Sequence, residues 1–267
     1  MAISLNIMFE HNYQAYTSRE IVRYYSQLRQ LQPAEQTILD LLEHEWSQMT
    51  MLDIGIGGGR TTQHFSRVVK EYVGIDYSEE MVAVCQKRFP LSSQLRIEVG
   101  DARDMSQFQD NSFDFILFSF NGLDVISHLD RLQVLQEVKR VGKSGGYFFF
   151  SSHNLQGLER EFKWQNQISL NPLKTYVNMI MFALLRFFNR SISPQQIKYS
   201  KHEIIQDESH NFRLKQYYIR PQEQLNQLKA YFENIRIYSW KSGLEITTQQ
   251  ELSDNSDMWL YYLCKIK

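Results

Sequence analysis

Five short apolar runs alternate with segments of helical periodicity between residues 51 and 152, and this alternation constrains the fold more than any other feature. The runs read MLDIGI, EYVGID, LRIEVGD, FDFILFSF and GYFFFSS, and helical patterns such as EEMVAVCQKRF and DRLQVLQEVKRV separate them. Runs of this length and composition are typical of buried strands. Strands that alternate with helices form right-handed βαβ units, so the sequence predicts an α/β fold with a doubly wound, mostly parallel sheet covered on both faces.

The chain on either side of this pattern adds further elements. Residues 16–45 show helical periodicity, with Pro33 suited to the first turn of a second helix. Near the end, NIRIYSW and MWLYYLCKI are typical of two more strands, and PQEQLNQLKAYF of the helix before them. Residues 155–216 break the rhythm with a long stretch rich in Asn and Gln that contains one apolar helix candidate, around residues 179–188. We therefore expect a seven-stranded sheet in a single domain, with an insertion after the fifth strand.

Composition excludes several classes of partner. The 29 Lys and Arg residues balance 30 Asp and Glu, so the whole chain has no field that attracts polyanions, and we expect no nucleic-acid partner. The most apolar stretch, MIMFALLRFF, is about half as long as a membrane span, and the N-terminus lacks the pattern of a signal peptide. Cys85 and Cys264 have no metal-ligand spacing and do not suggest a disulfide framework. These features predict a cytoplasmic protein with no membrane span.

The first predicted strand leads into a glycine-rich turn, MLDIGIGGGRTT, with Gly55, Gly57 and Gly59 just past the strand. In doubly wound folds a ligand binds at this place, because glycine lets the backbone approach it closely. A mononucleotide loop needs Lys followed by Ser or Thr, and Arg60 with Thr61 stands there instead. A dinucleotide fingerprint fits better, with an acid about 20 residues further on, but its third glycine falls one place early. An NAD-dependent oxidoreductase therefore stays open as an alternative.

Three further features favour a small, cationic adenosine derivative over a dinucleotide. Asp53 lies within the glycine motif, where its charge would repel a pyrophosphate but suits a ligand with an ammonium and a sulfonium centre. The turn after the third strand, VGDARDM, places Asp101 and the backbone of Ala102 where they can pair with an adenine edge. The turn after the fourth strand, SFNGLD, offers backbone carbonyls and small residues beside the glycine loop.

The ordered series LDIGIGGGRTT, GIDYS, GDARDM, FDFILFSFNGLD and VKRVGKSGGYFFFSS resembles the motifs of class I S-adenosylmethionine-dependent methyltransferases. The resemblance covers about residues 50–155, and YYIRPQEQLNQLKAYFENIRIYSW with WLYYLCKI is similar to the last two strands of that family. Each motif is weak alone, but five in this order with βα spacing are specific together. The resemblance implies a Rossmann-like sheet with an antiparallel last strand, and S-adenosylmethionine as the cofactor.

Matched position by position, the resemblance implies a cofactor site at the carboxyl ends of the first four strands. Its members are Asp53, Gly55 and Gly57 at the methionine and ribose, Asp76 at the ribose hydroxyls, Tyr77 packed on the adenine, Asp101 and Ala102 at the adenine edge, and the backbone of Ser119 and Phe120 near the methionine amino group.

The resemblance also implies a division of the single domain, residues 1–267. We expect an N-terminal helical lid in 1–48, a cofactor-binding core in 49–154, a substrate cap in 155–216, and the final helix and strands in 217–267. Four tyrosines precede the sheet and are candidates for an aromatic lid over the cofactor, although aromatic residues at helical spacing also occur in cores. They are Tyr13, Tyr16, Tyr24 and Tyr25.

Three residues are candidates for the chemistry, because methyl transfer needs a general base only when the acceptor must lose a proton. His153, in SSHN at the end of the fifth strand, is expected to point into the ligand crevice. His128 and Asp124 follow the fourth strand on the acceptor side; the alternatives are a capping or surface histidine for His128 and a helix N-cap for Asp124. The acids and histidines of KHEIIQDESHN have no metal-ligand spacing, so we expect no metal and a solvated loop there.

The apolar helix of the insertion bears on the acceptor. Met179, Phe182, Leu185 and Phe188 would form an apolar wall for it, but a helix packed on the sheet or a dimer contact also explains them. The sequence thus predicts an enzyme that methylates an oxygen or nitrogen atom of a small organic acceptor with apolar character, as a monomer or homodimer. The alternatives are the oxidoreductase and a non-catalytic module that binds S-adenosylmethionine.

Overall fold

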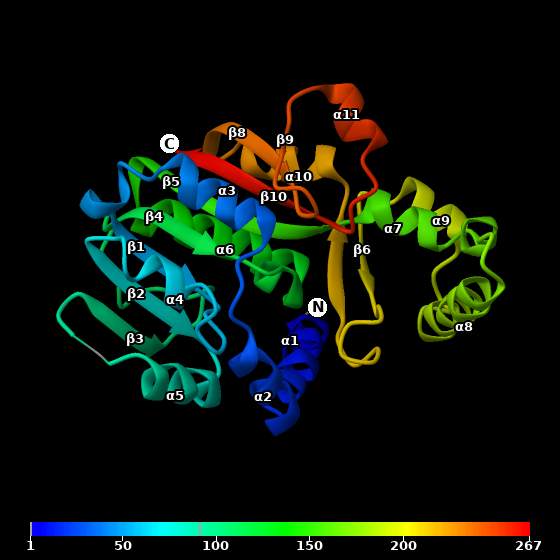
Figure 1. Ribbon diagram of the computed structural model, residues 1–267, viewed down its shortest axis with the longest axis horizontal. Helices are drawn as coiled ribbons and strands as arrows, with labels where there is room; N and C mark the ends of the chain where they lie inside the picture. Colours follow the sequence, from blue (N-terminus) through cyan, green and yellow to red (C-terminus); the bar gives the residue numbers. More distant parts are fainter. Residues whose placement is uncertain (1, 91) are drawn as a thin grey trace.

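The computed structural model (Figure 1) describes residues 2–90 and 92–267, and its centre is one mixed sheet. All seven strands expected from the sequence are present: β1 (Thr50–Ile54), β2 (Glu71–Asp76), β3 (Leu95–Val99), β4 (Phe113–Phe118), β5 (Gly142–Asn154), β8 (Phe232–Ser239) and β10 (Trp259–Ile266). The expected total of seven is corrected to ten in the part of the chain described, because three short strands join the sheet: β6 (His202–Ile205), β7 (Gln216–Ile219) and β9 (Glu245–Ile246).

Strand order and direction confirm the Rossmann-like class. The order is β3-β2-β1-β4-β5-β10-β8-β9, and neighbours among β1 to β5 pair in parallel. β10 runs antiparallel to both β5 and β8, as predicted for the last strand. The order reverses between β1 and β4, because the chain first moves outward through β2 and β3 and then returns. Ligands of doubly wound sheets bind at that reversal, beyond the carboxyl ends of the strands.

Helices cover both faces of the sheet. They are α1 (Ala2–Tyr16), α2 (Arg19–Gln27), α3 (Pro33–Leu41), α4 (Thr62–Phe65), α5 (Glu79–Arg88), α6 (His128–Val141), α7 (Leu155–Glu161), α8 (Pro172–Phe188), α9 (Pro194–Tyr199), α10 (Pro221–Leu228) and α11 (Gln249–Asp254), with 3₁₀ turns η1 (Trp46–Gln48), η2 (Gly122–Val125) and η3 (Trp164–Gln167). On one face Met51 and Phe115 pack with α3, α4 and α5; on the other Leu52 and Ile116 pack with α6 and α10. Successive strand residues thus alternate between two buried layers.

The N-terminal helix α1 lies mostly before residues 16–45, where the sequence shows helical periodicity, and Asn12 fixes it to the rest of the molecule. The Asn12 side chain is buried; its Nδ2 donates to the carbonyl oxygens of Val125 (2.7 Å) and Lys215 (2.8 Å), and its Oδ1 accepts from the Lys215 amide (3.0 Å). These bonds tie α1 to the turn after β4 and to the chain that enters β7. The helix is therefore held at the carboxyl end of β4.

Residues 155–216 form a small unit with a core of their own. Leu158 of α7, Leu185 of α8 and Tyr218 of β7 belong to this core. β7 pairs in parallel with the end of β5 at His153, and β6 pairs antiparallel with β7. Figure 1 shows α8 at the edge of the molecule, at the opposite end from β2 and β3. Within residues 2–90 and 92–267, no helix has the length and apolar character needed to span a bilayer.

Candidate functional site

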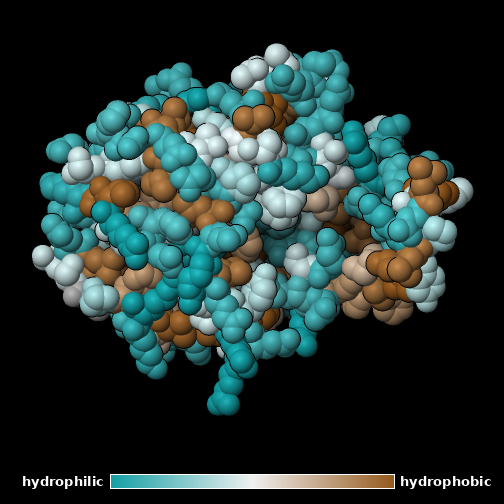
Figure 2. All heavy atoms as spheres, viewed as in Figure 1, coloured by the Kyte–Doolittle hydropathy of each residue, from teal (hydrophilic) through white to brown (hydrophobic). Residues whose placement is uncertain are grey.

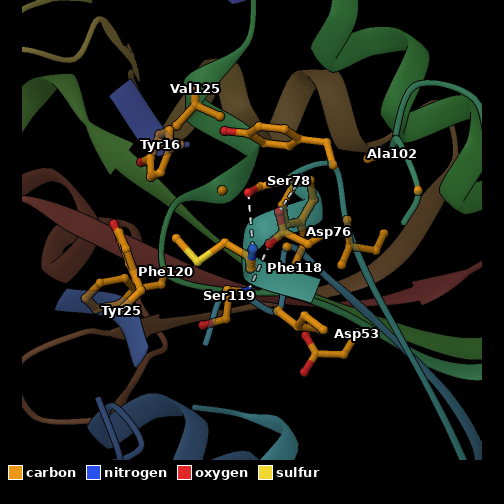
Figure 3. A pocket seen from close by; sticks show the side chains of 18 of the residues that line it. Tyr16, Tyr25, Asp53, Asp76, Ser78, Ala102, Phe118, Ser119, Phe120 and Val125 are labelled. Atoms are coloured by element: carbon orange, nitrogen blue, oxygen red, sulfur yellow. Dashed lines mark hydrogen bonds between the residues drawn. The ribbon is translucent and has the colours of Figure 1, made fainter. Parts of the chain in front are cut away.

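A cleft lies at the carboxyl ends of β1 to β4, where the strand order reverses. We call it the first cleft. All nine positions that the sequence assigned to a cofactor line it: Asp53, Gly55, Gly57, Asp76, Tyr77, Asp101, Ala102, Ser119 and Phe120. Figure 3 shows how the lining is arranged: Ala102 lies toward one end, Tyr25 and Phe120 lie toward the other, and Asp76 lies between them.

The glycine turn shapes one wall of the first cleft. Gly55 has a φ of 68° and Gly57 a φ of 52°, which residues with a side chain rarely adopt. The Gly57 amide donates to Asp76 Oδ2 (2.9 Å), so the turn and the end of β2 hold each other. Gly58 is required for close packing. A Cβ there would lie 2.4 Å from the Ser26 backbone, because α2 packs directly against the turn.

Two buried carboxyl groups, Asp53 and Asp76, lie in the same wall. Asp53 Oδ2 accepts from Thr61 (2.6 Å) and Tyr72 (2.5 Å), and Asp76 accepts from the Ser78 amide (2.9 Å) as well as from the glycine turn. Burial outweighs these hydrogen bonds and raises the pKa of Asp53 to about 7 and that of Asp76 to about 6. A ligand that brings positive charge or hydroxyl donors to these acids would favour their ionised forms.

Aromatic rings close the first cleft at the end near Ala102. Three rings of α1 surround that of Tyr77, with centroids 5.6 to 6.4 Å from it: Phe9, Tyr13 and Tyr16. The Arg103 guanidinium lies 3.8 Å from the centroid of the Phe9 ring, and its Nη2 donates to Asp101 Oδ2 (2.6 Å). This end of the cleft is therefore flat and aromatic, with the Asp101 carboxylate held in place by a neighbouring arginine.

A buried network of four side chains closes the opposite end, next to Ser119. Arg60, which follows the glycines, forms a bidentate pair with Glu35 of α3, and the Glu35 side chain is fully buried. Ser119 and Tyr261 also donate to the Glu35 carboxylate. Burial opposes a charge on Glu35, but the Arg60 guanidinium and the Ser119 hydroxyl outweigh it and lower the pKa of Glu35. The network thus ties α3, the glycine turn and the end of β4 together.

The chain leaves β4 through a strained turn. Phe120 and Asn121 have φ values of 55° and 60°, in the left-handed region that a phenylalanine seldom occupies. The Asn121 amide donates to Ser151 Oγ of β5 (2.7 Å), which holds the turn in this conformation. As a result, the Phe120 ring lies 4.9 Å from the Arg60 guanidinium and lines two clefts. Strain of this kind is concentrated where a protein has to aim a side chain at a ligand.

A second cleft adjoins the first at Phe120. The two clefts share Tyr16, Tyr25 and Phe120, and the second is also lined by Tyr24, Asn121, His153, Ser209, His210, Gln216 and Trp259. Its walls are largely aromatic. Three of the four tyrosines considered for a lid contribute to it, from α1 and α2, and Ser209 and His210 come from the insertion.

His153 lines the second cleft, and the buried Asp124 holds its ring from behind. His153 Nδ1 lies 2.8 Å from Asp124 Oδ2, and its Nε2 lies 3.2 Å from Asn121 Nδ2. Because an amide nitrogen only donates, these contacts assign the proton to Nδ1 and leave Nε2 as an acceptor. Asp124 is fully buried and also pairs with Arg131. Asp124 is therefore not the N-cap of α6, a place taken by Ser127; it orients His153.

Three buried polar atoms of the second cleft have no hydrogen-bond partner among the residues that the structure describes. They are Asn121 Oδ1, Gln216 Oε1 and Trp259 Nε1. Leaving such an atom unpaired costs about 1–3 kcal/mol, so buried polar atoms are rarely left without a protein, water or ligand partner. Each of these atoms is buried, so it lies behind the surface of the second cleft.

The structure does not bring His128 to either cleft. His128 begins α6, where its Nδ1 lies 2.7 Å from the Tyr217 hydroxyl and its ring stacks on that of His202 at 4.4 Å. The expectation that it follows β4 on the acceptor side is corrected, because η2 turns the chain before α6 starts. Burial, with the positive groups His202 and Arg131 nearby, lowers the pKa of His128.

The predicted apolar wall of the acceptor site is also corrected. Of the α8 side chains proposed for it, Met179 and Phe188 are exposed and Leu185 packs into the core of the insertion. The insertion reaches the second cleft through Ser209 and His210 instead, in a stretch expected to be a solvated loop. His210 Nε2 lies 3.2 Å from the hydroxyl of Tyr25, which joins this stretch to α2.

Sequence reasoning missed the buried pair of Arg60 with Glu35. One signal was available: an arginine inside a glycine run next to a ligand site needs a charged partner if it is buried. The partner itself carries no local signal, because Glu35 lies 25 residues earlier in a different helix. Among residues 2–90 and 92–267, no group of three or more His, Cys, Asp or Glu side chains is arranged to hold a metal ion.

Comparison with known proteins identifies the domain that carries the first cleft. The model of the family described as methyltransferase domain matches residues 52–150, which run from β1 into β5. The chain carries a class I S-adenosylmethionine-dependent methyltransferase domain. This methyltransferase domain implies S-adenosylmethionine as the cofactor, which confirms the interpretation of the motif series.

Two curated relatives are similar to the methyltransferase domain. Demethylmenaquinone methyltransferase of Shouchella clausii is 32% identical over 126 residues, covering 41% of this chain and 52% of the relative. Demethylmenaquinone methyltransferase of Staphylococcus aureus (strain MRSA252) is 37% identical over 101 residues, covering 37% of this chain and 40% of the relative. The chain thus spans about half the length of these relatives or less.

A solved structure extends the likeness of fold beyond the matched segment. An S-adenosylmethionine-dependent methyltransferase from Mesorhizobium loti aligns with a TM-score of 0.60 at 17% identity, covering 87% of this chain and 97% of that one. At this identity the alignment shows that the two chains share a fold.

Proposed function

We propose that this protein transfers the methyl group of S-adenosylmethionine to an oxygen or nitrogen atom of a small aromatic acceptor. The first cleft would hold the cofactor and the second would hold the acceptor. The observation that carries this proposal is the junction of the two clefts at Tyr16, Tyr25 and Phe120, with His153 on the acceptor side. A shared wall places donor and acceptor side by side, which is the main requirement of a displacement reaction.

The first cleft fits S-adenosylmethionine at each of its parts. Both hydrogen bonds to Asp53 go to Oδ2, which leaves Oδ1 for a cationic group of the ligand. Asp76 is positioned to accept from ribose hydroxyls, and the aromatic end around Tyr77 suits the adenine. When bound, S-adenosylmethionine supplies an electrophilic methyl carbon on a sulfonium centre. The Phe120 turn would then border the methyl group, because it separates the two clefts.

The second cleft fits a flat molecule that carries hydroxyl or amine groups. Aromatic walls favour a planar ring, and His153 Nε2 can accept from a donor, which phenols and ring amines have. Two relatives are named demethylmenaquinone methyltransferase, so the reduced hydroquinone form of demethylmenaquinone and simpler naphthols form the first acceptors to assay.

His153 is the residue we propose as general base. Its Nε2 would take the proton of the acceptor hydroxyl or amine as the acceptor atom bonds to the methyl carbon and the carbon–sulfur bond breaks, which leaves a neutral thioether in the first cleft. Asp124 holds the ring through Nδ1 and would stabilise the positive charge that results. Asn121 Nδ2 lies 3.2 Å from His153 Nε2, and the acceptor would replace it as the hydrogen-bond partner of Nε2. Asp124 is thus a positioning residue, and His128 is not part of the proposal.

The test is methyl transfer by His153→Gln, with His128→Gln as the matched control at a histidine outside both clefts. Wild-type protein is assayed with S-adenosylmethionine and a panel of naphthols, ring amines and the hydroquinone form of demethylmenaquinone, and cofactor binding is measured by calorimetry. We expect His153→Gln to lower kcat by about 10²–10⁴-fold with unchanged cofactor affinity, and the control to leave both unchanged. Equal activity of both variants would remove His153 from the mechanism. Cofactor binding without transfer to any acceptor would favour a non-catalytic module.

A further inference from the structure

Helix α8 presents a continuous apolar stripe to solvent. Its outward residues recur at helical spacing: Leu173, Tyr176, Val177, Ile180, Leu184 and Phe187. Leu173 is 71% exposed and Phe187 is 66% exposed, so neither packs against the protein. Figure 2 shows the apolar surface gathered at the α8 end of the molecule, where brown spheres form a broad patch. A patch of this kind on one helix marks a surface that something apolar covers.

Three polar side chains of α8 point in the opposite direction, toward their own segment of the chain. Thr175 Oγ1 donates to the Ser169 carbonyl (3.0 Å), and Asn178 Nδ2 donates to the Gln167 carbonyl (3.1 Å). Arg186 Nη1 donates to a backbone carbonyl on the far side of the turn that ends the helix (2.8 Å). A helix on the surface of a water-soluble protein normally shows the reverse pattern, with its apolar stripe inward. In α8, hydrogen bonds to the backbone of the segment thus fix the polar side of the helix, and the apolar side faces solvent.

The charge of the surrounding segment indicates what covers the stripe. Residues 162–202 contain six Lys and Arg and no Asp or Glu, which leaves 23 basic against 30 acidic residues in the rest of the chain. A second copy seated on this face in a two-fold contact would bring the same positive segment against the first. Repulsion between like charges would oppose that contact.

We propose that α8 lies flat on an anionic lipid bilayer, with its apolar stripe among the acyl chains and the exposed basic residues Lys174, Arg190 and Lys198 at the phosphate groups. A helix of 17 residues is about 25 Å long, which suits a position parallel to the membrane surface. Exposed Trp164 and Tyr199, before and after α8, are residue types that favour the interface between headgroups and chains. Basic residues add attraction to anionic headgroups. This inference does not depend on the methyl transfer.

The test is co-sedimentation of the full-length protein with vesicles of equal parts phosphatidylglycerol and phosphatidylcholine. We compare wild type with Leu173→Gln/Leu184→Gln on the stripe and with Leu129→Gln/Leu244→Gln, which alters two exposed leucines elsewhere. The stripe variant is expected to bind the vesicles about tenfold more weakly than wild type, because apolar contact with the acyl chains is lost. The control variant binds as wild type does. Binding of wild type also weakens in high salt and on vesicles of phosphatidylcholine alone.

Three outcomes would overturn the inference. The first is absence of wild-type binding to the anionic vesicles. The second is equal loss of binding in the stripe and control variants. The third is a wild-type dimer in sedimentation that the stripe variant dissociates while neither protein binds vesicles, which would assign the stripe to a contact between copies. Binding of S-adenosylmethionine is measured for each variant; unchanged affinity shows that the protein is folded and keeps this result separate from the proposed function.

Discussion

The first cleft and helix α8 treat polar and apolar groups in opposite ways. In the first cleft the backbone of the glycine turn, Asp53 and Asp76 line the cleft, and the apolar strand residues pack behind them. In α8, Thr175 and Asn178 donate hydrogen bonds to backbone carbonyls of the same segment, and the apolar side chains of the stripe face outward. The first region would bind a small molecule in its cleft. The second displays an apolar stripe that we propose lies on a bilayer.

The largest expected effect concerns the buried pair at the closed end of the first cleft. Glu35→Gln leaves the Arg60 guanidinium buried without a countercharge, which costs about 3–5 kcal/mol of the free energy of unfolding. Glu43→Gln, at an exposed glutamate in the turn after α3, is the control and stays within about 0.5 kcal/mol of wild type. Denaturant unfolding measures both. Equal stability of the two variants would show that the cleft does not depend on this charge pair.

The next largest effect concerns Asp76 and the affinity of the first cleft for S-adenosylmethionine. A change in this affinity distinguishes a binding site from a packed core. Asp76→Ala removes the acceptor proposed for two ribose hydroxyls, and we expect affinity for S-adenosylmethionine to fall about 100-fold. Asp254→Ala, at an exposed acid in α11, is the control and keeps wild-type affinity. Calorimetry measures the dissociation constants. Affinity that survives Asp76→Ala would place the ribose elsewhere.

Two adjacent leucines sharpen the comparison within α8 itself. Leu185→Ala removes a buried side chain from the core of the insertion and is expected to cost about 2 kcal/mol of the free energy of unfolding. Leu184→Ala alters the exposed stripe and is expected to change stability in water by less than about 0.5 kcal/mol. Thermal or denaturant unfolding gives both values. A large cost for Leu184→Ala would mean that the stripe packs against the protein after all.

The smallest expected effect is the pH dependence of cofactor binding. Burial raises the pKa of Asp53 to about 7 and that of Asp76 to about 6, so the ligand-free protein favours the neutral forms of both acids. Their contribution to the free energy of unfolding is lost as the pH rises through these pKa values. A cationic ligand favours the ionised acids. We therefore expect affinity to fall about tenfold between pH 8 and about pH 6.2, and binding near pH 6.5 to release protons. Calorimetry in buffers of different ionisation enthalpy measures that release; proton uptake would contradict it.

Sequence reasoning reached the first cleft because its signals are local. Strand length, the glycines at positive φ, and acids at strand ends are each visible within a few residues, and the fold brings these ends together. It did not reach β7, whose pairing with the end of β5 at His153 joins segments far apart in the chain. It did not give the direction of α8 either, because a helix with many apolar residues shows no clear inward face until Thr175 and Asn178 are seen bonded to the protein.

The measurement that tests the central claim most directly is isothermal titration of the purified wild-type protein with S-adenosylmethionine and, in parallel, with NADH. The first cleft predicts micromolar binding of S-adenosylmethionine at one site per chain and no binding of NADH. Binding of NADH alone would contradict the account, because a cleft with Asp53 in its wall and Arg60 in place of a third glycine would then hold a pyrophosphate.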